Sequence, residues 1–291
     1  MKKQLALGTA QIGMNYGITN KKGRIGIKEV YLMLEKAREG GIKILDTAQE
    51  YGIAEKIIGE SELRKSFSIV TKMIVKEGEH QEDWTRKCRE SRQRLNVEYI
   101  DTLLVHNPDQ IDRQISLNLA EWSQKIKREG VNKIGVSIYK EEDLINVDLN
   151  YIDAVQLPLS VYNQEHIQNG LISKLKRFGI EIQARSCFMQ GLILTDHREW
   201  PKNISQKLRM HHKMWEDHME KSKLTKMSGA LGFCKQSEAD IILIGATSCD
   251  EIKEITETWN KISNKDMDSG KWAWNTGTDT DPRNWKKGIT S

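Results

Sequence analysis

The chain has 291 residues, of which 38% are hydrophobic and 30% are charged, and its formal net charge is +4. This balance is typical of a globular protein that buries a sizeable core without disulfide or metal staples. The mean hydropathy of −0.60 and the short apolar runs argue against a membrane span, which needs about 20 apolar residues. The most basic stretch, residues 86–94, is interleaved with acidic residues, so we expect no nucleic-acid partner either.

The cysteines show no CxxC pair and no regular spacing; they are Cys88, Cys187, Cys234 and Cys249. This pattern argues against a zinc site and against a secreted disulfide framework. A reducing environment is the simplest interpretation, and we expect a cytoplasmic protein.

Eight short runs rich in Ile, Val and Leu alternate with segments of helical periodicity, which is typical of a parallel sheet with crossover helices. The predicted strands are residues 4–8, 43–46, 68–72, 101–106, 132–136, 153–157, 181–185 and 240–244. The predicted helices are residues 27–39, 54–64, 81–96, 112–129, 141–147, 166–178, 220–236 and 249–262. Eight of each predict an α/β fold, the (β/α)8 or TIM barrel.

No linker or low-complexity block divides the chain, so we expect a single barrel domain over residues 1–263. Two segments do not fit the repeat. Residues 187–219 form a long extra stretch after the seventh strand, and such loops on a barrel are usually functional. Residues 264–291 form an irregular tail with three tryptophans, which we expect to be buried somewhere.

Ionisable residues follow three consecutive strands at the end of the barrel where active sites form. Asp46, Lys72 and His106 end the second, third and fourth predicted strands, and Tyr51 follows in the second loop. Singly, each has a structural explanation: a helix cap, a strand end reaching solvent, a core histidine and loop packing. Together they are better explained as a working set, because unpaired charges are costly to bury at one rim.

This set suits proton donation to a carbonyl oxygen. A phenol has a pKa of about 10, and an adjacent ammonium lowers the pKa by stabilising the phenolate. We predict that Lys72 does this to Tyr51, that Asp46 pairs with Lys72, and that His106 holds the substrate oxygen. The hydride must come from a cofactor, because no side chain supplies one.

Short strings around these residues resemble those of the aldo-keto reductases, over about residues 3–260. The strings lie at residues 8–11, 45–52, 71–72, 104–106, 135–137, 155–158, 162–163, 184–192 and 244–248. The resemblance implies a (β/α)8 enzyme that uses NADPH without a Rossmann motif, with Asp46, Tyr51, Lys72 and His106 as the catalytic tetrad. It also implies that the tail folds over the barrel mouth.

The resemblance further implies a set of cofactor-binding residues. Ser137 and Gln156 would bind the nicotinamide carboxamide, and Arg185 lies where many members stack an aromatic ring. The loops after the seventh and eighth strands would hold the rest of the nucleotide through Ser186, Gln190, Gly191, Gly245, Ala246, Thr247 and Glu251.

Two residues depart from the family pattern. Ile138 replaces an Asn that contacts the carboxamide in many members. Glu251 replaces an Arg that binds the 2′-phosphate of NADP, and a carboxylate repels that phosphate unless Lys253 compensates. We expect NADP(H) as the family default and NAD(H) as the alternative.

The leading hypothesis is NAD(P)H-dependent reduction of an aldehyde or ketone, with a sugar-derived substrate suggested by similar family members. One alternative is a catalytically weak nucleotide-binding sensor or regulatory subunit on the same barrel, against which the intact tetrad argues. Another is a lyase that uses Lys72 as a Schiff base. Asp46 argues against it, because a nearby carboxylate raises the pKa of a lysine. The oligomeric state cannot be read from the sequence.

Three histidines in the long extra stretch offer imidazoles to a metal. They are His211, His212 and His218, and only Glu216 and Asp217 accompany them. We expect no metal site there, and a cofactor or substrate lid instead.

Overall fold

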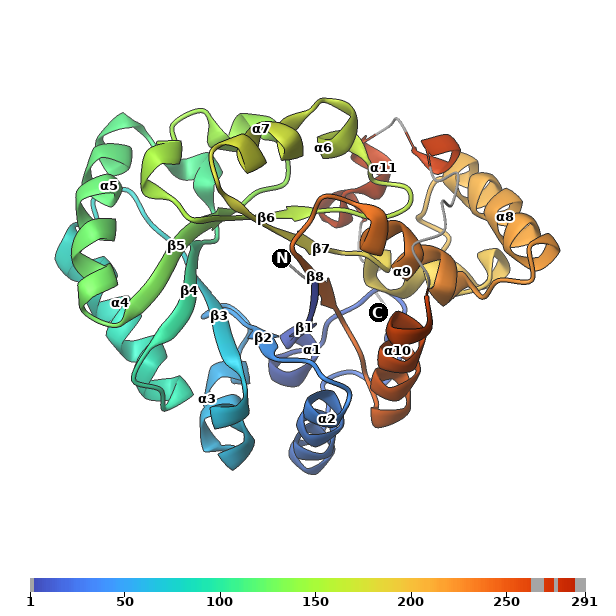
Figure 1. The fold of residues 1–291 in the computed structure, drawn as a ribbon, viewed down its shortest axis with the longest axis horizontal. Helices are drawn as coiled ribbons and strands as arrows, with labels where there is room; N and C mark the ends of the chain where they lie inside the picture. Colours follow the sequence, from blue (N-terminus) through green and yellow to red (C-terminus); the bar gives the residue numbers. More distant parts are fainter. Residues whose placement is uncertain (1–2, 263–269, 275–276, 286–291) are drawn as a thin grey trace.

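The computed structural model of the protein describes residues 3–262, 270–274 and 277–285. Eight parallel strands close into a barrel in chain order, with β8 pairing back to β1 (Figure 1). The strands are β1 Gln4–Gly8, β2 Ile44–Asp46, β3 Ser68–Met73, β4 Ile100–Val105, β5 Val131–Ser137, β6 Ala154–Pro158, β7 Glu181–Arg185 and β8 Ile241–Ile244. The predicted (β/α)8 barrel is confirmed, and every strand boundary lies within one residue of the prediction.

Helices surround the barrel on its outside (Figure 1). The longer ones are α2 Ile27–Glu39, α3 Ala54–Glu60, α4 Gln81–Leu95, α5 Arg113–Arg128, α7 Leu171–Arg177, α8 Gln206–Lys221, α9 Lys226–Gln236 and α10 Cys249–Lys261. The short ones are α1 Ala10–Gly13, α6 Glu165–Gln168 and α11 Gly277–Thr280. Short 3₁₀ helices span Glu62–Ser66, Pro108–Gln110, Glu141–Leu144, Leu149–Tyr151, Met189–Leu194, His197–Glu199, Gly270–Trp272 and Pro282–Asn284.

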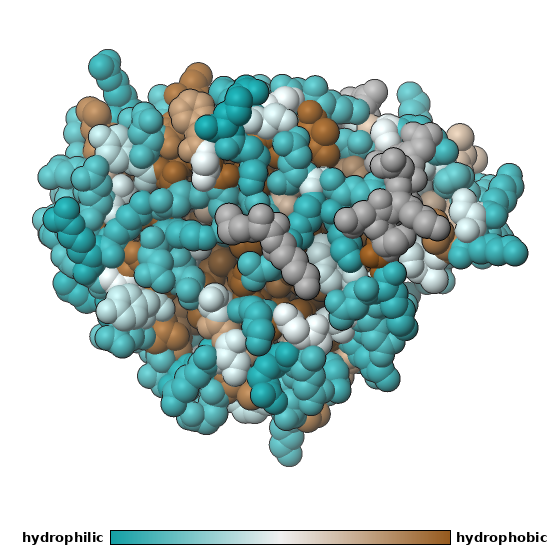
Figure 2. Space-filling view, viewed as in Figure 1, coloured by the Kyte–Doolittle hydropathy of each residue, from teal (hydrophilic) through white to brown (hydrophobic). Residues whose placement is uncertain are grey.

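The helices bury apolar faces against the outside of the barrel, as α5 illustrates. Its buried residues include Ile115, Trp122 and Ile126, which recur at helical spacing on one face. The indole N–H of Trp122 donates to the hydroxyl of Thr85 on α4 at 2.8 Å, so its one polar atom is satisfied. Figure 2 shows the outcome on one face, where polar residues cover most of the surface and apolar residues gather near the centre.

Four of the predicted helices are wrong in detail. The helix predicted at 54–64 ends at Glu60, and a 3₁₀ helix follows at Glu62–Ser66. Residues 141–147 form a 3₁₀ turn instead of an α-helix, because the Asp143 carboxylate accepts the backbone N–H groups of Tyr139 and Lys140 and tightens the segment. Gly170, with a positive φ of 77°, divides residues 166–178 into α6 and α7. The helix predicted at 220–236 begins at Lys226.

The long extra stretch after β7 contains a complete helix, α8, which lies to one side of the barrel (Figure 1). Ser205 caps it by accepting the backbone N–H of Leu208. Among the described residues, no helix is long and apolar enough to cross a membrane. The four cysteines are free.

Candidate active site

Several residues of the site lie on the barrel strands or directly after them, and their side chains point into the barrel. Ala6, Ile44, Val70, Leu104 and Ala154 pack against one another inside the barrel. Side chains alternate between the two faces of a strand, so the residue two positions further along points inward again. These next inward positions are Gly8, Asp46, Lys72, His106 and Gln156.

Lys72 and Asp46 form a buried ion pair at the ends of β3 and β2. The Lys72 ammonium lies 2.6 Å from Asp46 Oδ1 and also donates to the Thr47 carbonyl at 2.8 Å. Burial lowers the pKa of Lys72, and the charge and hydrogen bond of Asp46 oppose that shift. Gln156 Nε2 donates to the other carboxylate oxygen at 2.8 Å. Both oxygens of Asp46 are therefore engaged.

Tyr51 lies in the loop after β2, beside this pair. The Lys72 nitrogen is 5.0 Å from the centroid of the Tyr51 ring. Burial raises the pKa of Tyr51, Asp46 raises it further, and Arg185 opposes them. The expected net lowering of this pKa is therefore wrong, because burial and the Asp46 carboxylate outweigh the opposing positive charge. The phenol stays protonated at neutral pH, which is the state a proton donor needs.

A close approach of two glycines fixes the position of Tyr51. A Cβ on Gly13 of α1 would lie 1.7 Å from the Tyr51 carbonyl oxygen, and one on Gly52 would lie 2.5 Å from the Gly13 carbonyl oxygen. Gly52 also has a positive φ of 56°, which favours glycine. These contacts fasten the Tyr51 loop to α1.

His106 follows β4 and faces Tyr51 edge to face, with ring centroids 6.0 Å apart. Burial, with the charges of Lys72 and Arg185, lowers the pKa of His106 to about 3. The imidazole is therefore neutral at physiological pH, and it offers a hydrogen bond without carrying a charge.

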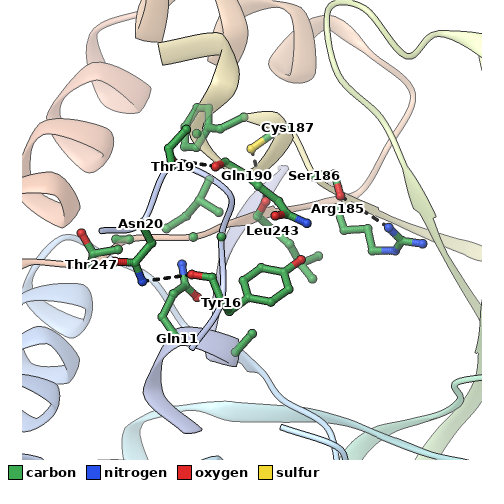
Figure 3. A pocket seen from close by; sticks show the side chains of 18 of the residues that line it. Gln11, Tyr16, Thr19, Asn20, Arg185, Ser186, Cys187, Gln190, Leu243 and Thr247 are labelled. Carbon is green, nitrogen blue, oxygen red and sulfur yellow. Dashed lines mark hydrogen bonds between the residues drawn. The ribbon is translucent and has the colours of Figure 1, made fainter. Parts of the chain in front are cut away.

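A cavity of about 300 Å³ extends from Tyr51 and Asp46 to the start of α10. Figure 3 shows Tyr16 in its middle, with Thr247 to one side and Arg185 to the other. Of the residues assigned to the cofactor by resemblance, Ser137 is buried at the end of β5, outside the described lining. The lining includes the other cofactor residues: Gln156, Arg185, Ser186, Gln190, Gly191, Gly245, Ala246, Thr247 and Glu251. Of the tetrad, Asp46 and Tyr51 line the cavity, and Lys72 and His106 lie outside the lining.

The loop after β1 is a part of the site that the sequence analysis missed. It is fastened across the cavity to the loop after β7: the Ile18 N–H donates to Gln190 Oε1 at 3.0 Å, and the Thr19 hydroxyl donates to the Gln190 carbonyl at 2.8 Å. Gly191 permits this contact, because a Cβ there would lie 2.1 Å from Thr19 Oγ1. The family-like string at residues 8–11 was the available sequence signal for this region, but it ends before the residues that contact Gln190.

Glu251 occupies the start of α10. Its carboxylate accepts the Thr247 backbone N–H at 2.6 Å and the Thr247 hydroxyl at 3.0 Å. Ser248 caps the same helix by accepting the Glu251 N–H at 3.3 Å. The Glu251 carboxylate therefore accepts the hydrogen bonds of Thr247 that would otherwise be available to a bound anion.

Arg185, at the end of β7, stacks on an aromatic ring. The Tyr139 ring centroid lies 4.1 Å from the Arg185 guanidinium carbon, and Arg185 Nη2 donates to the Ile138 carbonyl at 2.9 Å. Arg283, from the tail, lies 3.7 Å from the same centroid. Described tail residues thus reach the loop after β5.

The histidines of α8 hold loops and the tail. His212 Nδ1 lies 2.6 Å from the Tyr162 hydroxyl, and Nε2 lies 2.8 Å from the Thr195 carbonyl, so both nitrogens are engaged. His211 Nε2 lies 3.0 Å from the Trp272 carbonyl. The His218 ring lies 5.3 Å from the Trp272 ring.

Asp196, His197 and Glu216 have the ligand types of a metal site, with atoms within 4.8 Å of one another. However, Arg198 lies 2.7 Å from Asp196, and Lys226 lies 2.8 Å from Glu216. Both carboxylates already have cationic partners, and the cluster is explained as an ion-pair network.

The fold and these side chains define a (β/α)8 barrel with a buried Asp–Lys pair beside a tyrosine and a neutral histidine. The model of the Aldo/keto reductase family matches residues 4–273. The chain therefore belongs to the aldo-keto reductase family, whose members are oxidoreductases.

Individual relatives are distant. The chain is 27% identical to the methylglyoxal reductase DkgB of Escherichia coli O157:H7 over 174 residues, which are 56% of this chain and 63% of that protein. It thus spans less than two thirds of this curated relative. The holo form of an aldo-keto reductase from Bacillus halodurans has a TM-score of 0.73 at 16% identity, covering 92% of this chain and 90% of that one. An aldo-keto reductase from Klebsiella pneumoniae in complex with NADPH has a TM-score of 0.68 at 17% identity, covering 90% and 92%.

Proposed function

We propose that the protein reduces an aldehyde or ketone with a nicotinamide nucleotide, and that Tyr51 donates the proton. The observation that carries this proposal is the grouping of a protonated Tyr51, a neutral His106 and the buried Asp46–Lys72 pair beside a cavity that Tyr51 and Asp46 line. The name of the E. coli relative gives methylglyoxal, a small carbonyl compound. A sugar-derived aldehyde or ketone remains our proposal for the substrate here.

The cavity suits a dinucleotide because it runs from the catalytic residues to a helix N-terminus and is bordered by glycines. A Cβ on Gly245 would lie 2.8 Å from Gln11 Nε2, so a side chain there would narrow the cavity. When bound, the nicotinamide supplies the hydride. Ser137 and Gln156 would hold its carboxamide, Arg185 would border its ring, and the loops after β7 and β8 would hold the remainder through Ser186, Gln190, Gly191, Gly245, Ala246, Thr247 and Glu251.

Each tetrad residue then has a defined task. Negative charge develops on the carbonyl oxygen as hydride arrives, and Tyr51 transfers its phenol proton to that oxygen. His106 donates a neutral N–H hydrogen bond to the same oxygen. Lys72, 5.0 Å from the ring, stabilises the phenolate that remains, and Asp46 keeps Lys72 in place.

Replacing Tyr51 with Phe tests the reaction. We expect loss of nucleotide oxidation by small aldehydes while the nucleotide dissociation constant, followed by tryptophan fluorescence, stays the same. Tyr99→Phe, at an exposed tyrosine, is the matched control. Turnover that survives Tyr51→Phe contradicts the proposal, and borohydride trapping of substrate on Lys72 would favour the lyase alternative.

The cofactor preference depends on Glu251. NADP(H) is the family default, but the carboxylate at Thr247 favours the ribose hydroxyl of NADH over the 2′-phosphate of NADPH. Fluorescence titrations with both nucleotides test this preference. We expect NADH to bind more tightly than NADPH. The difference between the two dissociation constants should shrink in Glu251→Gln. It should stay the same in Glu254→Gln, which changes an exposed carboxylate on the same helix. Tighter NADPH binding by the unmodified protein contradicts the preference.

We also propose that residues 264–291 cover the barrel mouth. The described part of the tail supports this proposal. The backbone N–H of Trp274 donates to the Tyr162 carbonyl at 2.8 Å, and Arg283 stacks on Tyr139. Residues 264–269, 275–276 and 286–291 lie outside the described ranges. A chain ending after Ser263 should show altered kcat/KM ratios between bulky and small aldehydes. Unchanged substrate selectivity would count against the proposal.

A further inference from the structure

Arg185 places a positive charge at the catalytic end of the cavity. Its guanidinium donates to the Ile138 carbonyl at 2.9 Å and to the Ser186 hydroxyl at 3.4 Å, and neither acceptor is charged. No ion pair among the described residues includes Arg185. A guanidinium has five N–H donors, so N–H groups remain for a further acceptor.

The acidic side chains of the same cavity are already committed. Asp46 is bonded to Lys72 and Gln156, and Glu251 is bonded to Thr247. Figure 3 shows Thr247 and Arg185 on opposite sides of Tyr16, which places Glu251's partner away from the guanidinium. The charge of Arg185 is therefore not neutralised from within the cavity.

Arg283 provides an internal comparison, because its guanidinium also lies over the Tyr139 ring. Its guanidinium is 2.7 Å from the Asp281 carboxylate, which neutralises it. The structure thus holds two similarly stacked guanidiniums, and only Arg185 lines the cavity with Tyr51.

The charges around Arg185 leave the catalytic end positive. Lys72 and Asp46 cancel each other at 2.6 Å. The pKa of His106 is lowered to about 3 and that of Tyr16 is raised to about 12, so both side chains are uncharged at neutral pH. A single cation in a confined site attracts an anionic ligand, and a planar carboxylate matches a guanidinium in shape.

We propose that Arg185 recognises a carboxylate on the substrate, so that the natural substrate is an aldehyde or ketone that also bears a carboxylate. This inference rests on the proposed carbonyl reduction and adds the substrate class. Stacking against a nicotinamide would use the flat face of the guanidinium, whereas carboxylate recognition uses its N–H edge. One residue can therefore serve both groups.

Matched substrates that differ only in charge test the inference. The first pair is 4-formylbenzoate and 4-formylbenzamide, and a smaller pair is succinic semialdehyde and its amide, 4-oxobutanamide. We expect the unmodified protein to show a higher kcat/KM for the carboxylated member of each pair. Arg185→Gln should lower that preference by about 10-fold or more, the size expected for losing a charge-assisted hydrogen bond. Arg185→Lys should retain part of it, and Arg86→Gln, which removes a guanidinium paired with Asp83 on the exposed face of α4, should leave it in place.

A binding measurement separates substrate recognition from catalysis. Benzoate should bind the nucleotide-saturated protein more tightly than benzamide does, and Arg185→Gln should remove the difference. Equal kcat/KM values within both pairs, unchanged in Arg185→Gln, overturn the inference and leave carbonyl reduction standing. Weaker nucleotide binding in Arg185→Gln with an unchanged preference also overturns it, because Arg185 then serves the cofactor alone. Failure to bind either nucleotide or to reduce any of the four aldehydes overturns the proposed function itself.

Discussion

The two ends of the cavity are built in different ways. At the catalytic end, Asp46 and Lys72 come from the neighbouring strands β2 and β3, and Gln156 comes from β6 of the same closed barrel, so the ladder of backbone hydrogen bonds fixes their spacing. At the other end, loops after β1, β7 and β8 carry the lining, and side-chain contacts such as the one between Gln190 and Ile18 hold them. The ion pair beside the proton donor thus lies on strands, whereas the residues proposed to bind the nucleotide lie mostly on loops.

The largest effect should come from breaking the strand-borne ion pair. Lys72→Met leaves Asp46 buried without its cation, which should cost about 3–5 kcal/mol in the free energy of unfolding and abolish turnover. Lys176→Met is the matched control, because Lys176 pairs with Asp240 at the same 2.6 Å but is 34% exposed. Its cost should stay near 1 kcal/mol, as for surface pairs. Urea titrations measure the loss of unfolding free energy in both variants. Equal losses would contradict the expected difference between the buried and the exposed ion pair.

Acid should weaken the support of the loop-borne region, because His212 on α8 bonds to the carbonyl of Thr195, which lines the cavity. Burial lowers the pKa of His212 to about 4, whereas an unfolded histidine has a pKa of about 6.5. The unfolded chain therefore binds a proton that the folded chain rejects, so stability is complete above about pH 6.5 and falls as the pH decreases towards 4. The loss attributable to His212 should approach about 3 kcal/mol at pH 4.

Urea unfolding between pH 7.5 and 4 checks this effect. His212→Gln should be less stable than the unmodified protein at pH 7.5, because the hydrogen bond to Tyr162 is disturbed. The free energy of unfolding of the variant should fall less steeply as the pH decreases. If its pH dependence equals that of the unmodified protein, other groups, such as His106, dominate the loss of stability in acid.

A smaller effect should come from crowding the junction between the two regions. Gly13→Ala forces the Tyr51 loop away from α1, since the added Cβ would lie 1.7 Å from the Tyr51 carbonyl oxygen. Overpacking of this kind costs about 1–3 kcal/mol, and kcat should fall more than nucleotide affinity because Tyr51 moves. Gly26→Ala is the control, since nothing lies within 4 Å of a Cβ there. Equal stability and kcat in both variants contradict this account of Tyr51.

The same division explains what the sequence could predict. Asp46, Lys72 and His106 were found because each ends a predicted strand, and the short apolar runs that mark strands are local information. Ile18 and Thr19 in the loop after β1 were missed because their place depends on Gln190, more than 170 residues away. The direction of the pKa shift of Tyr51 was wrong for a related reason. It depends on burial and on Asp46 together, and neither can be measured along the chain.

The smallest effect should come from loosening the loop-borne end. Gln190→Ala removes the acceptor for the Ile18 N–H, and such a hydrogen bond contributes about 1 kcal/mol. If the loop after β1 must lie across the cavity to retain nucleotide, the dissociation constant should rise about fivefold, while kcat at saturating nucleotide stays the same. Gln93→Ala, at an exposed glutamine on α4, is the control. A fall in kcat with unchanged affinity would show that this contact supports the catalytic end, and the division between the two ends would then be wrong.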